Sequence, residues 1–111
     1  MMTYADLIQA LNATGIPFTE AAWHDATKLK DDYGVYALDN RHDLMANNKH
    51  SERFVEGTID LFAITSRGDH QAALIETALE SVGAFWRLNY GPHYEQDTRY
   101  THWEWVFDVL P

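Results

Sequence analysis

The order of its periodic segments constrains this 111-residue chain more than any motif does. A helical pattern comes first, three strand-like segments follow, and a second helical pattern precedes two closing strand-like segments. Helices that flank a run of strands, rather than alternating strictly with them, favour an antiparallel sheet with helices on one side. We therefore predict a single α+β domain over residues 1–111, of order α-β-β-β-α-β-β. Its mostly antiparallel sheet of about four or five strands carries both helices on one face.

The first helical pattern has a signal at each end. Thr3 can cap a helix over Tyr4–Ala13, and Asp6 completes a box-like exchange of hydrogen bonds three residues later. Gly15 and Pro17 end it, because glycine tolerates a left-handed cap and proline cannot continue a helix. The apolar face of this helix is expected to consist of Tyr4, Leu7, Ile8 and Leu11.

The second helix has two candidate N-caps, Ser66 and Asp69, and ends at Gly83. Asp69 closes an Arg-Gly-Asp tripeptide, which we interpret as a helix start rather than an adhesion motif. Glu76 and Glu80 are expected opposite the apolar stripe. That stripe consists of Leu74, Ile75, Ala78, Leu79 and Val82.

Alternation of apolar and polar residues indicates the strands. We predict them at Phe18–His24, Gly34–Leu38, Phe54–Thr65, Phe85–Tyr90 and Tyr100–Leu110. The last segment has the strongest pattern, with one apolar face that should meet the two helices. That face consists of Trp103, Trp105, Phe107 and Val109.

The remaining strand signals are more local. Phe62 and Ile64 make both faces of the third strand apolar near its end, so we expect that half to be buried. Gly57 in the same strand could mark a bulge. We expect one face of the fourth strand to carry Trp86, Leu88 and Tyr90.

Two connections are expected to be exposed. Gly91 and Pro92 should break the fourth strand and start a polar loop over Gly91–Thr98. Asn40–Arg53 is long for a hairpin connection, and it contains both donors and acceptors, together with Leu44 and Met45. Two readings of this segment stay open: a solvated tip, or a protruding arm, at about residues 40–53, that contacts another protein.

Composition excludes several classes of protein. Apolar residues make up 46% of the chain, which is enough for one packed core. The formal charge of −9 argues against tight nucleic-acid binding, because such binding depends on neutralised phosphates. With no cysteine there is no disulfide and no Cys-based zinc site. No secretory signal or apolar span is visible, so we expect a cytoplasmic protein or one assembled there, with no membrane contact.

No motif for catalysis stands out. The six histidines lack the paired spacing of a metal site, although His102 and Glu104 share a strand face. No serine lies in a nucleophile elbow, and no glycine-rich phosphate loop is present. We expect no catalytic residue, no metal and no cofactor. The face bearing His102 and Glu104, with Glu56 and Asp60, should be wet or covered by a neighbour.

Several stretches resemble the tail terminator, or tail completion, proteins of long-tailed bacteriophages, a family also labelled minor tail or minor capsid proteins. They are Met2–Ile8, Tyr33–Tyr36, Ala46–Lys49, Glu56–Thr65 and Trp103–Val109. The resemblance covers nearly the whole chain as a pattern of strand and helix types. It implies a sheet with two helices on one side and no catalytic residues.

The resemblance also implies a function. Such proteins form a homo-oligomeric ring, usually a hexamer, that caps the tail tube and joins the tail to the head–tail connector at the head-proximal end of the virion. DNA would pass through the bore without tight binding. Contacts with neighbouring subunits or the tube are expected from the exposed segments, at Arg41, Asp43, Leu44, Met45, Asn47, Asn48, Lys49, Arg53, His93 and Tyr94.

Two other classes of function stay open. The first is a small acidic protein-binding module of the immunity type, whose partner would be basic. The second is an enzyme that uses the acidic sheet face with His102. Capture of one cationic partner would favour the first, and turnover that is lost on replacing His102 and Glu104 would favour the second.

Overall fold

The computed structural model describes residues 1–21, 31–39 and 54–111. In these ranges the chain forms two helices, α1 (Tyr4–Asn12) and α3 (Gly68–Ser81). It also forms five strands: β1 (Phe18–Glu20), β2 (Tyr33–Leu38), β3 (Val55–Ala63), β4 (Phe85–Glu95) and β5 (Tyr100–Val109). The α+β class and the order α-β-β-β-α-β-β are therefore confirmed.

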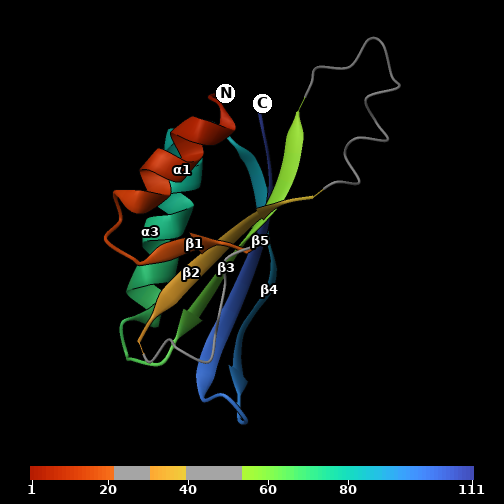
Figure 1. The fold of residues 1–111 in the computed structure, drawn as a ribbon. Coiled ribbons are helices and arrows are strands. Elements are labelled where there is room, and N and C mark those ends of the chain that lie inside the picture. The colour runs from red at the N-terminus through yellow and green to blue at the C-terminus, as the bar shows by residue number, and fades with distance from the viewer. Residues whose placement is uncertain (22–30, 40–53) are drawn as a thin grey trace.

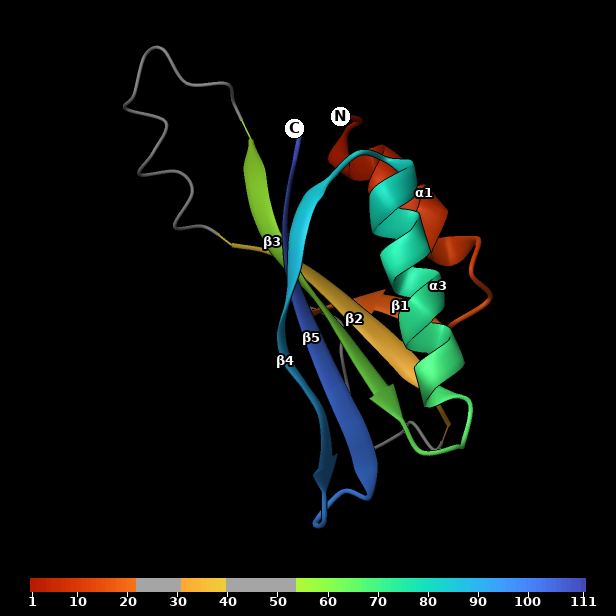
Figure 2. The same ribbon diagram turned by 180° about the vertical axis from the view of Figure 1, so that it is seen from behind.

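The strands form one sheet of order β1-β2-β3-β5-β4. Pairing is antiparallel except between β1 and β2, which run parallel. Both helices cover the same face of the sheet (Figures 1 and 2), which we call the inner face; the opposite face is the outer face. β5 is an interior strand, because β3 and β4 pair with its two sides. β4 lies at one edge of the sheet.

The inner face of β5 provides the largest side chains of the core. Its inner residues are buried, and Trp105 is fully so, as the alternation predicts. Leu7 and Leu11 of α1 and Ile75 and Leu79 of α3 are buried in the same cluster. Burying each such side chain contributes about 1.5–3 kcal/mol, so this contact between layers dominates the stability of the fold.

Two indole hydrogen bonds join α3 to the sheet. The Trp105 indole N–H donates to Glu76 at 2.9 Å, and the Trp86 indole N–H donates to Glu80 at 2.7 Å. The expectation that both glutamates lie away from the sheet is therefore wrong. They lie at the border of the apolar stripe, where two large indoles reach them from β5 and β4.

The two helices begin in different ways. In α1 the predicted capping box is present, with Thr3 accepting from the Asp6 amide at 3.2 Å. In α3 the N-cap is Arg67, with no hydrogen bond from its side chain to the helix, so both predicted caps, Ser66 and Asp69, are wrong. A distant residue, Asp32, instead orders the turn that leads into α3.

Asp32 lies just before β2 and is 2% exposed. Its carboxylate accepts hydrogen bonds from the backbone amides of Ile64 at 2.7 Å and Thr65 at 2.9 Å, and also from the Thr65 hydroxyl. Burial raises the pKa of Asp32, but the hydrogen bonds from Thr65, Ile64 and Gln71 outweigh burial and lower it overall. The charged form therefore fixes the path from β3 into α3.

Other strand predictions need correction. The pairing of β3 runs through Gly57 without a shift, so no bulge lies there. Glycine is required because a Cβ at this position would lie 2.5 Å from both the Phe107 ring and the Ala37 carbonyl oxygen. Ile64 lies beyond the end of β3 and is exposed, whereas it was expected to be buried. β1 ends at Glu20, and the end of the strand predicted to residue 24 lies outside the described residues.

The fourth strand shows the largest difference. β4 continues through Gly91 and Pro92 to Glu95, so the predicted loop over Gly91–Thr98 is wrong for its first five residues. The pairing with β5 shifts register between Leu88 and Tyr90 and again between Tyr90 and His93. A strand at the edge tolerates proline because its outward N–H has no partner in the sheet.

We predict that Asp32→Ala lowers the free energy of unfolding by about 3 kcal/mol at pH 7, because two backbone amides and the Thr65 hydroxyl lose a buried, charged acceptor. The stabilisation by Asp32 is present above the pKa of an unfolded aspartate, about 3.9, and is lost as pH falls through the lower folded value. Urea denaturation at pH 7 and at pH 3 measures both effects. Asp31→Ala is the matched control, because the Asp31 side chain is 71% exposed; equal losses in the two variants would contradict the role given to Asp32.

Candidate functional site

Most residues expected to make contacts cannot be placed. Arg41, Asp43, Leu44, Met45, Asn47, Asn48, Lys49 and Arg53 lie outside the described residues, as does the predicted arm at 40–53. His93 and Tyr94 are described, and they belong to β4 rather than to a loop. His93 pairs with His102 and Tyr94 with Thr101, so the two side chains lie on opposite faces of the sheet.

The outer face carries a group that we call the histidine cluster: Asp60, Phe62, Tyr90, Glu95 and His102. These residues come from β3, β4 and β5, and sheet pairing brings them together. The register shift after Leu88 turns Tyr90 to this face, opposite Glu104. The expectation that Tyr90 shares a face with Trp86 and Leu88 is therefore wrong.

His102 lies at the centre of this cluster. Its Nε2 is 2.7 Å from Asp60 Oδ1 on β3, and its Nδ1 is 3.4 Å from Glu95 Oε2 on β4. Its ring stacks on Phe62 with a centroid separation of 4.3 Å and an interplanar angle of 13°, and the Tyr90 ring lies 5.1 Å away. One imidazole thus bridges the strands on both sides of β5.

The chemistry of His102 follows from these two contacts. Burial lowers the pKa of His102, but hydrogen bonds and charge from Asp60 and Glu95 outweigh burial and raise it. A neutral imidazole has one N–H donor, whereas the imidazolium ion has two and can serve both carboxylates. In the charged form neither nitrogen offers a lone pair to a metal ion or to a substrate proton. Among the described residues, no group of three or more possible ligands is arranged to hold a metal.

Two tyrosines extend the cluster towards β2. Tyr33 stacks on Phe62 with centroids 4.9 Å apart, and Tyr100 meets Tyr33 edge to face at 5.4 Å. Burial raises the pKa of Tyr33 to about 12, with the nearby charges of Tyr100, Glu95 and Asp60 adding to it. Tyr33 therefore stays neutral at physiological pH, and this end of the outer face forms an aromatic wall beside His102.

The edge strand β4 presents a different surface. In the described part of the chain no strand pairs with the side of β4 that faces away from β5. Four large side chains on β4 are exposed, with Phe85 at 64% and Tyr94 at 55%, together with Leu88 and Tyr90. An edge of this length with exposed apolar residues is a typical place for another chain to pair.

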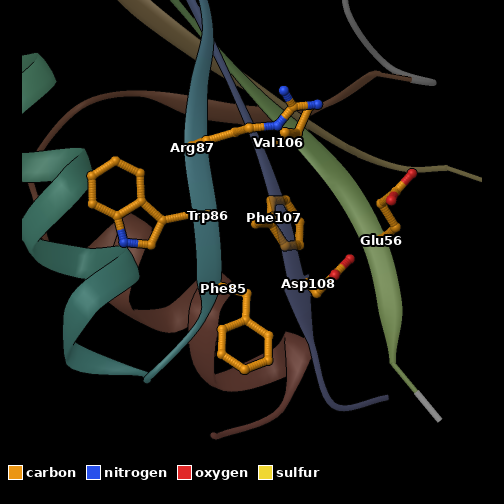
Figure 3. Close-up of a pocket in the computed structure, with 7 residues that line it drawn as sticks. All are labelled: Glu56, Phe85, Trp86, Arg87, Val106, Phe107 and Asp108. Atoms are coloured by element: carbon orange, nitrogen blue, oxygen red, sulfur yellow. The ribbon is translucent and has the colours of Figure 1, made fainter. Parts of the chain in front are cut away.

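A shallow depression of about 260 Å³ lies beside Phe85–Leu88, which we call the upper half of β4 (Figure 3). Arg87 extends from β4 over Val106 of β5, while Trp86 points the other way, towards α3. Two carboxylates, from Glu56 and Asp108, lie on the far side of the depression. Its lining is Glu56, Phe85, Trp86, Arg87, Val106, Phe107 and Asp108. Its lining combines apolar side chains with charged side chains of both signs.

Sequence reasoning placed His102, Glu104 and Asp60 on one face, and the pairing of β3 with β5 confirms this. It missed Glu95, which the continued alternation of His93 and Glu95 beyond Pro92 could have indicated. It also missed the exposed part of β4, because Phe85 and Arg87 carry no motif.

Comparison with protein-family models, with curated proteins and with solved structures finds no match for this chain. None of the helices in the described ranges is long and apolar enough to cross a membrane.

We predict that Gly91→Ala detaches the lower half of β4. Gly91 has φ +92°, and a Cβ there would lie 2.1 Å from the His102 carbonyl oxygen. The left-handed backbone costs about 1–2 kcal/mol for alanine, and the overlap with backbone atoms adds about 1–3 kcal/mol. Thermal or urea unfolding measures the loss.

Gly15→Ala is the matched control for this substitution. Gly15 has φ +83°, but nothing lies within 4 Å of an added Cβ, so only the backbone term applies. If the two variants lost equal stability, the close approach of Gly91 to β5 would not matter.

Proposed function

We propose that this protein is a structural subunit of a bacteriophage tail, of the tail terminator or tail completion type. In this proposal copies of the chain form a ring that caps the tail tube and joins it to the head connector. The proposal rests on the resemblance over nearly the whole sequence. It is supported by agreement between the α-β-β-β-α-β-β fold, with both helices on one face, and the fold that the resemblance implies.

The open edge of β4 is the observation that carries the proposal. Monomeric proteins usually protect such an edge with proline, lysine, a bulge or a covering segment. In β4 the proline and both register shifts lie beyond Leu88. The upper half, Phe85–Leu88, keeps a regular ladder with β5 and exposes Phe85 and Leu88. This half suits pairing with a second copy of the chain.

Charge sets the conditions for assembly. Each chain has a formal charge of −9, so a ring of six carries −54 and repels DNA in its bore. The same charge opposes association of the copies, and dissolved salt screens it over about 10 Å at 0.1 M. We therefore expect added salt to favour the ring. Binding to a basic partner would instead weaken with salt.

Termination needs a difference between the two ends of the ring. One end must match the tail tube, and the other must lack the surface that recruits the next ring of tube subunits. The ring then stops polymerisation and leaves a surface for the connector. This mechanism needs shape and charge and no chemical step.

Light scattering at several protein concentrations, with and without tail tubes, tests the proposal. We expect a ring in solution or on the tube, and binding to tubes of a major tail protein. A free monomer that assembles on the tube agrees with the proposal. A strict monomer that does not bind tubes contradicts it.

We predict that Leu88→Asp weakens self-association or tube binding at least about tenfold, or 1.4 kcal/mol, because it places a charge on the upper edge of β4. Stability should change by less than about 1 kcal/mol, since Leu88 is exposed. Sedimentation with tubes and urea unfolding measure the two quantities. Leu38→Asp is the control, an exposed leucine on β2. Equal effects of the two substitutions would remove β4 from the interface.

A further inference from the structure

The lower end of the β4–β5 hairpin has a shorter ladder than its upper end, which pairs four residues, Phe85–Leu88, with β5. Beyond the second register shift, three residue pairs join β4 to β5: His93 with His102, Tyr94 with Thr101, and Glu95 with Tyr100. The hairpin then turns, and the Arg99 amide donates to the Glu95 carbonyl oxygen at 2.7 Å. This end therefore depends on contacts made by side chains as well as on its short ladder.

The side-chain contact comes from His102. Through Asp60 it reaches β3, and through Glu95 it reaches the last residue of β4. The side chains of His102, Asp60 and Glu95 are 16%, 18% and 28% exposed, so water screens these contacts in part. The charged ring also lies on the face of Phe62, which favours a cation.

We propose that the protonation state of His102 is a switch that locks or releases the end of the β4–β5 hairpin. With the imidazole charged, one N–H binds Asp60 and the other binds Glu95, so β3, β5 and β4 are held together on the outer face. This inference does not depend on the proposed function. It concerns a conformational device within one chain.

Loss of one proton breaks the weaker half of this bridge. The neutral ring keeps a single N–H, and the 2.7 Å contact with Asp60 is the better hydrogen bond to keep. The other nitrogen then directs a lone pair at Glu95, which turns attraction into repulsion. Glu95 loses its contact with His102, and the end of β4 keeps its three ladder pairs and the local contacts of Glu95 with Thr98 and Arg99 in the turn.

The effect of His102 on pH dependence must be distinguished from the effects of the other titratable groups around it. On β5, Glu104 accepts a hydrogen bond from the Asn89 side chain at 2.8 Å. Burial raises the pKa values of Tyr33, to about 12, and of Tyr100, which also lies near Asp32 and Asp31, so neither gains charge near neutral pH. Among the residues that the structure describes, the titratable groups around the imidazole are Asp60 from β3, Tyr90, His93 and Glu95 from β4, Tyr100 and Glu104 from β5, and Tyr33 from β2.

The direction of the pH effect follows from the raised pKa of His102. The stabilisation of the hairpin end by charged His102 is complete below the pKa of an unfolded histidine, about 6.5. It is lost as pH rises through the higher pKa of His102 in the folded protein. Between the two values, hydrogen-exchange protection of the hairpin should fall by up to about tenfold per pH unit, after correction for intrinsic exchange.

The test is an NMR titration of the whole chain, with hydrogen exchange followed over the same pH range for those amides of His93–Glu95 that hydrogen-bond to β5. We expect the His102 ring signals to titrate above pH 6.5 and these amides to lose protection at the same midpoint. His102→Gln should remove this pH dependence. His93→Asn, which replaces the neighbouring imidazole on the same face, should keep it.

Glu95→Gln separates the switch from a general effect of the imidazole on stability. It should lower the His102 midpoint and remove most of the pH dependence of these amides, while the fold is kept. The proposal is overturned if wild-type His102 titrates at or below pH 6.5. It is also overturned if the amides of His93–Glu95 that hydrogen-bond to β5 keep equal protection on both sides of the midpoint. Both readings come from the wild-type protein, so they stand even where a variant fails to fold.

Discussion

The buried face of β5 holds the two layers of this protein together. Trp105 is fully buried between the sheet and the helices, and its indole N–H reaches Glu76 of α3 at 2.9 Å. One helical turn later, Glu80 accepts the indole N–H of Trp86 on β4. Two large apolar rings thus set the distance between α3 and the sheet, and two hydrogen bonds set its position along the strands. Loss of either layer would leave these indoles without cover.

The position of β5 also explains why the outer face is organised. Every second residue of β5 points away from the helices, so His102 and Glu104 lie between the outer residues of β3 and β4. β5 can therefore bridge both of its neighbours with a single imidazole. β4 pairs with β5 alone, and its other side is the edge that we assign to self-association. One strand organises the core, the histidine cluster and the attachment of the candidate interface.

Short-range patterns predicted much of this fold. The alternation of Trp103, Trp105 and Phe107 with mostly polar residues indicated β5 and its buried face, because apolar residues at every second position are typical of a half-buried strand. The cap of α1 was predictable because Thr3 and Asp6 lie within one turn. Each of these signals lies within a few residues of the structure that it predicts.

Long-range contacts explain what could not be predicted. Asp32 binds amides 32 and 33 residues further along, so no local pattern identifies it as the residue that orders the start of α3. Pro92 predicts a strand break, but β4 continues through it, because an edge strand needs no N–H donor on the side that faces solvent. The contacts of His102 with Asp60 and Glu95 are diagonal across three strands, and they require a register that no sequence pattern specifies.

Assembly of the proposed ring depends on pairing between the upper edge of β4 and another copy of the chain. Hydrogen–deuterium exchange of Phe85–Leu88, compared between dilute protein and the ring or tube-bound form, measures this pairing directly. We expect amides facing away from β5 to exchange quickly in dilute protein and to become protected on assembly. Assembled protein whose β4 amides exchange as fast as those of the dilute protein would contradict it.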